Sequence, residues 1–174
     1  MKKLSSKDFD EIFKIMQDAF PLEEYRDFDG QKNSLSDDKY NIITQSAENG
    51  KIISFIAFWE FQDFIYIEHF ATDLQFRGKG IGTQFLKDFI SSNEKTIILE
   101  AEPPCDEISK NRIAFYERMG FVTNKYDYLQ PPLRKNTKPF KLLVLSLNQS
   151  LSKNAFDNFK KSVYQSVYKA NDIV

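Results

Sequence analysis

Hydrophobic residues near the start of the chain recur at the three- and four-residue spacing of one helix face. Ser5 and Asp8, which lie three residues apart, form a predicted capping box for this helix, and Pro21 is predicted to end it. The residues expected on its buried face are Phe9, Ile12, Phe13, Met16 and Phe20.

The next stretch is rich in β-branched and aromatic residues and is interrupted by short polar turns. Residues 40–47, 52–61 and 64–72 are predicted to be strands, with Asn49 and Gly50 in the first turn. Because turns this short connect neighbouring antiparallel strands, this stretch predicts an antiparallel meander.

From Gly78 onward, helices and strands are predicted to alternate. A glycine-rich loop opens a helix with an apolar face, a strand follows at residues 96–102, and a second helix covers residues 111–119 with Gly120 at its C-cap. The apolar face of the first of these helices consists of Ile81, Phe85, Leu86, Phe89 and Ile90.

The last part of the chain predicts strands at residues 122–129 and 140–147, then an amphipathic helix at about 152–170. The whole order predicts an α/β (α+β) fold with a mixed, mostly antiparallel central sheet, helices on both of its faces and an additional C-terminal helix. We expect a single domain over residues 1–174, with its core at about 5–147.

Composition and charge narrow the classes of function. The chain has 174 residues, a net charge of −1 and a single cysteine, Cys105. This charge gives no general attraction to nucleic acid or to an anionic membrane. No stretch reaches the roughly 18 apolar residues of a membrane span, and the N-terminal residues turn acidic where a signal peptide would be apolar. We therefore expect a cytoplasmic protein without nucleic-acid or membrane partners.

The segment QFRGKGIG, from Gln75 to Gly82, is the strongest candidate for binding a phosphate group. Its three glycines let the backbone approach a bulky anion, and N–H groups at the start of the following helix can hold a pyrophosphate. Arg77 and Lys79 add positive charge. A simple chain reversal is the alternative without a function.

Other phosphate-binding loops fit this segment less well. A dinucleotide-binding Gly-x-Gly-x-x-Gly motif counted from Gly78 ends on Thr83, although Glu100 lies where a ribose-binding acid is expected. That site also needs a parallel strand–helix–strand unit, whereas the preceding strands form an antiparallel meander, so this alternative stays open but weaker. A Walker A loop is excluded, because no Gly-Lys pair is followed by Ser or Thr.

Two signatures resemble those of the GNAT N-acetyltransferase superfamily. Gln75-x-x-Gly78-x-Gly80 resembles the first, and NRIAFYERMGF, residues 111–121, resembles the second. FPLEEYR, IEHFATD, FYERMGF and YLQPPLR further resemble a bacterial subgroup of that family. Leu74 departs from the pattern, since relatives often carry proline there, and this affects only the local turn.

This resemblance implies a GNAT-type fold that binds acetyl-CoA as its cosubstrate, without a metal, and transfers the acetyl group to an amine. It implies that the loop backbone holds the pyrophosphate, that Phe70 and Ala71 pair with the pantetheine arm, and that Asn111 binds this arm from the other side. The loop residues assigned to the cofactor are Gln75, Phe76, Arg77, Gly78, Lys79, Gly80, Ile81 and Gly82.

The resemblance also places Tyr116 at the position of the family's general acid, where a phenol can protonate the departing thiolate. Without the motif, a packing role for this tyrosine would be preferred. A fixed N–H near Phe70 or Ala71 can stabilise the developing oxyanion. Glu68 precedes this place on the same strand and is the predicted base, directly or through water, because an amine with a pKa near ~10 must lose a proton before it attacks. A solvated polar residue is the alternative.

Three alternatives to this chemistry remain. His69, the only histidine, could serve as the base, and it could also assist a covalent acyl transfer through Cys105. Asp106 and Glu107 next to Cys105 disfavour a thiolate, and one histidine with one cysteine falls short of a usual zinc site. The alternative from another class is a sensor or interaction module that binds CoA or acyl-CoA without turnover.

Acidic residues indicate the charge of the acceptor. The resemblance places several of them beside the acceptor site, which favours a cationic amine, either a small molecule or a peptide. The residues assigned to the acceptor are Glu23, Glu24, Glu100, Glu102 and Tyr128. The aromatic last helix packs on its own core or on a second subunit, so a homodimer is an open alternative.

Overall fold

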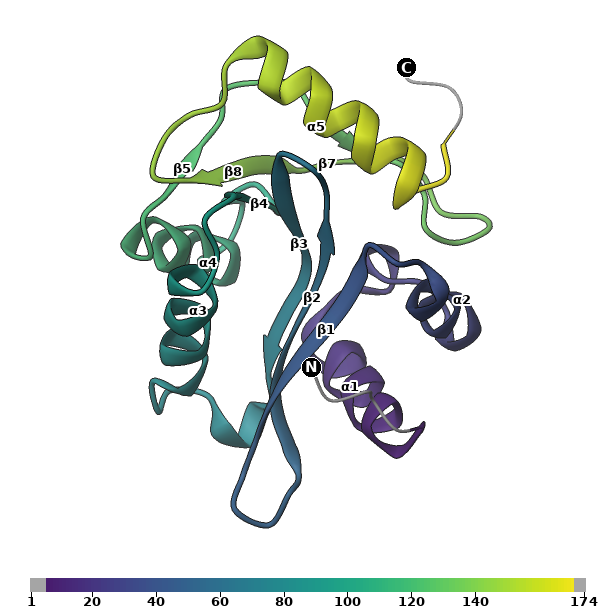
Figure 1. Cartoon of the computed structure of the whole chain (residues 1–174), viewed down its shortest axis with the longest axis vertical. Helices are drawn as coiled ribbons and strands as arrows, with labels where there is room; N and C mark the ends of the chain where they lie inside the picture. Colours follow the sequence, from purple (N-terminus) through teal and green to yellow (C-terminus); the bar gives the residue numbers. More distant parts are fainter. Residues whose placement is uncertain (1–5, 171–174) are drawn as a thin grey trace. The chain divides into compact units, whose positions relative to one another are not determined.

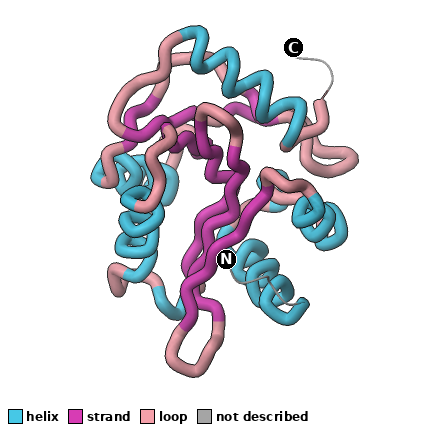
Figure 2. The backbone as a smooth tube through the Cα atoms, viewed as in Figure 1, coloured by secondary structure: helices cyan, strands magenta, loops and turns pink. Residues whose placement is uncertain are grey.

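The computed structural model describes residues 6–170, which belong to two compact units. Unit 1 consists of Met1–Glu60 and Ile67–Glu94, and unit 2 of Phe61–Tyr66 and Lys95–Val174. Figures 1 and 2 show the helices and strands of each unit. The predicted capping residue Ser5 lies outside the described residues, and the single-domain organisation stays a prediction.

An antiparallel pair of strands forms the centre of unit 1, as the short turn predicts. β1, Tyr40–Ser46, pairs with β2, Ile52–Glu60, and β3, Phe64–Thr72, follows along the chain. The turn between the first two contains Gly50 at φ +81°, a conformation that glycine adopts without strain. Eight of the nine side chains of β2 are buried, which requires cover on both faces of the strand.

Helices provide this cover from both sides within unit 1 (Figure 1). α1, Ser6–Ala19, contacts β2 and buries Phe9, Phe13 and Met16 of its predicted face. α3, Ile81–Ser91, lies on the opposite side, where the ring of Phe89 packs 5.0 Å from that of Phe58. The prediction of helices on both faces of the sheet is therefore confirmed for this unit.

The segment between α1 and β1 contains short helices that the sequence patterns did not predict. They are the 3-10 turn η1, Leu22–Glu24, the helix α2, Phe28–Asn33, and the 3-10 turn η2, Ser34–Ser36. Asp27 caps α2 by accepting a hydrogen bond from Gly30 N at 2.8 Å. Helices this short show no hydrophobic periodicity, so the capping residue was the only local signal.

Unit 2 is built on antiparallel strands and two helices. Three of its strands pair with one another: β4, Thr96–Ala101, and β5, Phe121–Thr123, both pair with β8, Leu143–Leu147. Its helices are α4, Glu107–Arg118, and α5, Lys153–Ser166. The predicted C-terminal helix is thus confirmed, and Phe156, Phe159, Val163 and Val167 of its apolar face are buried.

Two predictions for unit 2 need correction. α4 begins at Glu107 and not at residue 111, because Asp106 and Ser109 form a capping box that starts the helix earlier. The strand predicted at residues 122–129 is split into β5 and β6, Leu129–Gln130. β6 pairs with β7, Phe140–Lys141, to form a separate two-stranded sheet.

The strands of the described residues form a six-stranded sheet in the order β1-β2-β3-β4-β8-β5, in addition to the β6-β7 pair. The chain therefore has the predicted mixed α/β fold with a mostly antiparallel sheet and a C-terminal helix. Among residues 6–170, no helix combines the length and the apolar character that a membrane span requires.

Candidate functional site

The glycine-rich loop joins β3 to α3 through a 3-10 turn, η3, Leu74–Phe76. Asp73 starts this turn by accepting a hydrogen bond from Gln75 N at 2.9 Å. Arg77 Nε donates to the carbonyl oxygen of Thr72 at 2.9 Å. These contacts fix the entry to the loop and hold the arginine side chain along the backbone.

The three glycines of the loop are explained in two different ways. Gly78 and Gly80 have φ of +74° and +77°, and a Cβ on either would meet no atom of the described residues within 4 Å. By contrast, a Cβ on Gly82 would lie 2.7 Å from Thr72 Oγ1 and 3.3 Å from Phe70 Cζ. Gly82 therefore lets α3 pack against β3, whereas the space beside Gly78 and Gly80 is open to a ligand.

The start of α3 provides hydrogen-bond donors for an anion next to this open space. Gly80 occupies the N-cap without a side-chain cap, and the first N–H groups of a helix have no acceptor within the helix. The ammonium groups of Lys79 and Lys51 lie 5.2 and 5.7 Å from the centre of the Phe76 ring. Lys51 is already ion-paired with Asp73 at 2.8 Å. The backbone donors and Lys79 can hold a pyrophosphate, so the loop fits the predicted cofactor group.

The other predicted cofactor and catalytic residues lie on β3 and α4. In unit 1, the carbonyl oxygen of Ala71 accepts a hydrogen bond from Ser54 Oγ at 2.9 Å, and the Phe70 ring borders Gly82. In unit 2, Asn111 is exposed on α4, and Tyr116 is buried with its ring 5.7 Å from that of Phe121. The first set belongs to unit 1 and the second to unit 2, so a single site formed by both sets stays a prediction.

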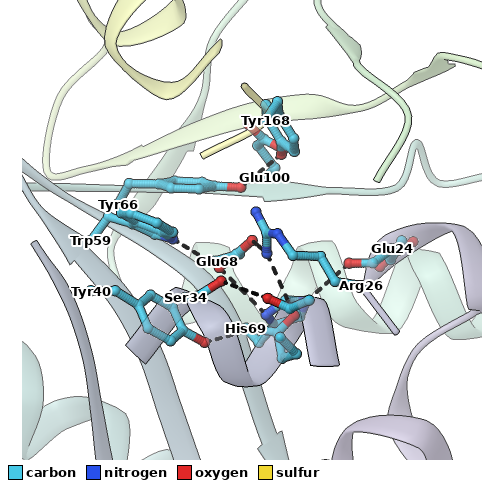
Figure 3. A network of polar contacts seen from close by, with 12 residues as sticks. Glu24, Arg26, Ser34, Tyr40, Trp59, Tyr66, Glu68, His69, Glu100 and Tyr168 are labelled. Atoms are coloured by element: carbon cyan, nitrogen blue, oxygen red, sulfur yellow. Dashed lines mark hydrogen bonds and ion pairs between the residues drawn. The ribbon is translucent and has the colours of Figure 1, made fainter. Parts of the chain in front are cut away.

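Glu68 is the most tightly held of the predicted site residues (Figure 3). Arg26 Nη1 donates to its Oε1 at 2.5 Å, and Trp59 Nε1 donates to its Oε2 at 2.8 Å. The side chains of Arg26 and Glu68 are only 12% and 2% exposed. Burial alone would raise the pKa of this carboxyl, but the charge of Arg26, helped by His69 and Trp59, holds the pKa below its usual value.

The neighbouring His69 is buried and has a defined tautomer. Its Nε2 lies 2.9 Å from the carbonyl oxygen of Glu24, which can only accept, so Nε2 carries the proton. Its Nδ1 has no hydrogen-bond partner among the described residues and lies 3.9 Å from Glu68 Oε2. Burial lowers the pKa of His69 more than the nearby Glu68 raises it, so the ring is neutral near pH 7.

These contacts bear on the predicted base. A carboxylate whose two oxygens already accept hydrogen bonds and whose pKa is lowered is a weak proton acceptor. The base role of Glu68 stays a prediction, but its surroundings favour a role in holding structure. Arg26 and Trp59 were missed as partners, although Arg26 belongs to the FPLEEYR segment already noted in the sequence.

A second carboxylate cluster lies in unit 2. Tyr128 donates a hydrogen bond to Glu100 Oε1, and Tyr168 donates to Glu100 Oε2 at 2.6 Å. Because the single hydroxyl proton of Tyr168 is used in this way, Tyr66 donates in the 3.0 Å contact between the two hydroxyls. Figure 3 shows Tyr66, Tyr168 and Glu100 together. Burial, and next the charge of Glu100, raise the pKa of Tyr128 and of Tyr168 well above the usual value.

The remaining acidic candidates have simpler surroundings. Glu102 accepts a hydrogen bond from Arg112 Nη1 at 2.7 Å within unit 2. Glu23 is exposed on η1, and Glu24 is partly buried there. The structure thus brings Glu100 and Tyr128 within hydrogen-bond distance of each other, whereas a gathering of the acceptor candidates at one site stays a prediction.

Two comparisons with known proteins point to the same family. The profile described as "Acetyltransferase (GNAT) domain" matches residues 41–123, which contain the glycine-rich loop, α4 and β5. A GNAT-family protein from Bacteroides thetaiotaomicron has 25% identity and a TM-score of 0.85, and the alignment covers 98% of each chain. Both matches are to acetyltransferases of the GNAT family. Among curated proteins, no sequence match was found.

Two more distant N-acetyltransferase structures have a similar fold. The ribosomal-protein-S18-alanine N-acetyltransferase from Escherichia coli has 20% identity and a TM-score of 0.61, covering 87% of this chain and 94% of its own. An aminoglycoside 6'-N-acetyltransferase complexed with coenzyme A has 14% identity and a TM-score of 0.56, covering 84% and 93%.

Proposed function

We propose that this protein transfers the acetyl group of acetyl-CoA to an amine by direct attack in a ternary complex. The glycine-rich loop carries the proposal. Two glycines with positive φ leave open space before an uncapped helix start, at the position of the first GNAT signature. That arrangement suits a pyrophosphate, which the coenzyme supplies.

The residues of the chain have separate tasks in this proposal. Backbone N–H groups from Phe76 to Gly82 hold the pyrophosphate, and Phe70 and Ala71 pair with the pantetheine arm. Asn111 binds that arm from its other side. These assignments follow the match of the two motifs to the family, and the open side of the loop supports the first of them.

The reaction forms one bond and breaks another. The amine nitrogen attacks the thioester carbon, the C–N bond forms, and the C–S bond breaks to release the thiolate of CoA. Tyr116 gives its phenolic proton to that thiolate, and an N–H near Phe70 or Ala71 stabilises the oxyanion. The proton of the amine passes to Glu68, as predicted from the sequence, or to water. No metal takes part.

The acceptor is proposed to be a cationic amine, either small or part of a peptide, that the acidic residues attract in the cytoplasm. The names of the related structures include both kinds, an aminoglycoside and the alanine of a ribosomal protein. The alternative is a module that binds CoA or acyl-CoA without turnover. Release of free thiol from acetyl-CoA in the presence of an amine distinguishes the two.

The cofactor site can be tested with two matched glycine substitutions. Gly80 and Gly50 both have positive φ and open space around Cβ, so Gly80→Val and Gly50→Val impose similar backbone strain. By calorimetry, we expect Gly80→Val to weaken acetyl-CoA binding by about tenfold or more and Gly50→Val to leave it within about twofold. Equal affinity in both folded variants would contradict the assignment of the loop.

The general acid can be tested with Tyr116→Phe, which keeps the ring and removes the proton. We expect turnover to fall by about ten- to a thousandfold with little change in acetyl-CoA affinity, the usual range for general acid catalysis. Thiol release in single-turnover experiments measures the chemical step directly. An unchanged rate of this step would show that Tyr116 serves only in packing.

A further inference from the structure

Two sequence segments that lie 40 or more residues apart in the chain meet in unit 1. The first is FPLEEYR, residues 20–26, and the second is IEHFATD, residues 67–73. Arg26 of the first segment donates to Glu68 of the second at 2.5 Å. His69 of the second donates to the backbone carbonyl of Glu24 at 2.9 Å. Two adjacent residues of β3 therefore hold the segment that follows α1.

The contacts continue through this segment to the next strand. Arg26 Nη1 also lies 3.4 Å from Gln31 Oε1, and Gln31 Nε2 donates to Tyr40 OH at 2.7 Å. Tyr40 stands on β1, and its ring lies 4.9 Å from that of Trp59 on β2. A continuous polar network thus joins α2 to all three strands of unit 1, with Glu68 at its buried end.

We propose that Arg26 and Glu68 are a positioning pair that fixes residues 22–36 next to the acetyl-binding part of β3. This inference rests on the proposed function, because that function assigns the acetyl group to Phe70 and Ala71, two and three residues beyond Glu68. The segment then forms the wall beside the reacting carbon, and its placement decides how the acceptor amine is presented. Glu68 contributes geometry, and the amine proton leaves to water.

The chemistry of the pair explains why it is charged. Removing two charges from water costs free energy, and an apolar contact would hold the segment without that cost. An arginine–carboxylate contact, however, fixes distance and direction at once, because the planar guanidinium donates along set lines. Trp59 donates to the second oxygen, so the carboxylate of Glu68 has one orientation. Arg26, and with it the segment of residues 22–36, is therefore held in one position.

The same contacts make Glu68 unsuited to move a proton. A proton on either oxygen would remove the negative charge, weaken the hydrogen bonds from Arg26 and Trp59, and leave the buried guanidinium without its counter-charge. The positioning role therefore predicts that the acid limb of the pH–rate profile belongs to the acceptor amine and not to Glu68.

The test compares Glu68→Gln and Arg26→Lys with Asp29→Asn, which neutralises an exposed carboxylate on α2, within the segment of residues 22–36. For both variants of the pair we expect the acceptor KM to rise by about tenfold, with acetyl-CoA affinity within about twofold. Amide hydrogen exchange of residues 22–36 should accelerate by about tenfold or more. Asp29→Asn should behave as the wild type. The acid limb should keep its position in every variant.

The opposite pattern would overturn the proposal. If Glu68→Gln lowers kcat about a hundredfold, recovers at high pH and leaves exchange at residues 22–36 unchanged, Glu68 is the base. Arg26→Lys keeps the charge and is the milder change, so it remains informative if Glu68→Gln does not fold. A wild type that releases no thiol with any amine would remove the proposed function, while hydrogen exchange would still show whether the pair holds the segment.

Discussion

The two units each contain a carboxylate that accepts hydrogen bonds from two directions, yet the donors differ. In unit 1, Glu68 is held by a guanidinium and an indole N–H. In unit 2, Glu100 is held by the phenols of Tyr128 and Tyr168. A guanidinium brings a counter-charge together with its hydrogen bond, whereas a phenol brings only the hydrogen bond. The protein thus stabilises one carboxylate with a cation and the other with neutral hydrogen-bond donors.

This difference decides which residues change their pKa. Next to Arg26, the pKa of Glu68 is lowered although the side chain is buried. Around Glu100, the shift appears on the phenols, because burial and the nearby negative charge both oppose their ionisation. Glu68 therefore depends on one cation, and the Glu100 cluster depends on neutral tyrosines. Removing a hydrogen-bond donor should therefore lower the free energy of unfolding more at Glu68 than at Glu100.

The largest effect is expected from Arg26→Met, which keeps much of the side-chain volume and removes the cation. It leaves the carboxylate of Glu68 buried without its counter-charge, a change that typically costs about 3–5 kcal/mol of the free energy of unfolding. Urea denaturation measures this loss. The exposed Lys87 on α3 provides a control of equal charge, and Lys87→Met should stay within about 0.5 kcal/mol of the wild type.

A double variant tests whether the loss of stability in Arg26→Met comes from the unpaired charge of Glu68. Arg26→Met combined with Glu68→Gln removes both charges and leaves an oxygen to accept the hydrogen bond from Trp59, so it should recover much of the stability that Arg26→Met loses. No recovery would mean that the arginine acts through its packing and not through its charge.

A smaller effect is expected from Tyr168→Phe, which removes one neutral donor from Glu100 and the acceptor of the Tyr66 hydroxyl. Hydrogen bonds to charged groups contribute about 1.5–3 kcal/mol, so we expect a loss of the free energy of unfolding in this range. Tyr126 donates to the carbonyl oxygen of Leu151 at 3.0 Å, and Tyr126→Phe removes a bond to a neutral acceptor in the same unit. That loss should be only about 0.5–1.5 kcal/mol. Equal losses would show that the charge of Glu100 gives the tyrosine cluster no advantage.

The smallest effects concern the pH dependence of stability. The contribution of Glu68 should be lost at low pH, and that of the tyrosines around Glu100 at high pH. The lowered pKa of Glu68 stabilises the folded state above the usual value of 4.5, and this contribution is lost as pH falls below it. The raised pKa values of Tyr128 and Tyr168 give stability that is complete below the usual value of 10.0 and is lost as pH rises above it. Thermal unfolding across pH measures both limbs. Glu68→Gln should flatten mainly the acid limb, and Tyr168→Phe mainly the alkaline limb.

The sequence by itself determined the elements whose signals are local. The helical spacing of apolar residues located α1, α3 and α5, and the Asn49-Gly50 turn indicated the antiparallel pair. The glycines of the loop could also be interpreted from the sequence, because glycine lacks a Cβ and so permits positive φ and close contacts. Each of these features depends on residues within a few positions of one another.

Only the tertiary structure decided the partners of the buried carboxylates. Arg26 and Glu68 are 42 residues apart, and Glu100 and Tyr168 are 68 apart, so no local pattern connects them. From the strand alone Glu68 was predicted to be a base, and the arginine that lowers its pKa became visible only in the fold. The pKa of a buried group depends on the charges and donors that folding brings within hydrogen-bond distance, and sequence spacing does not contain those distances.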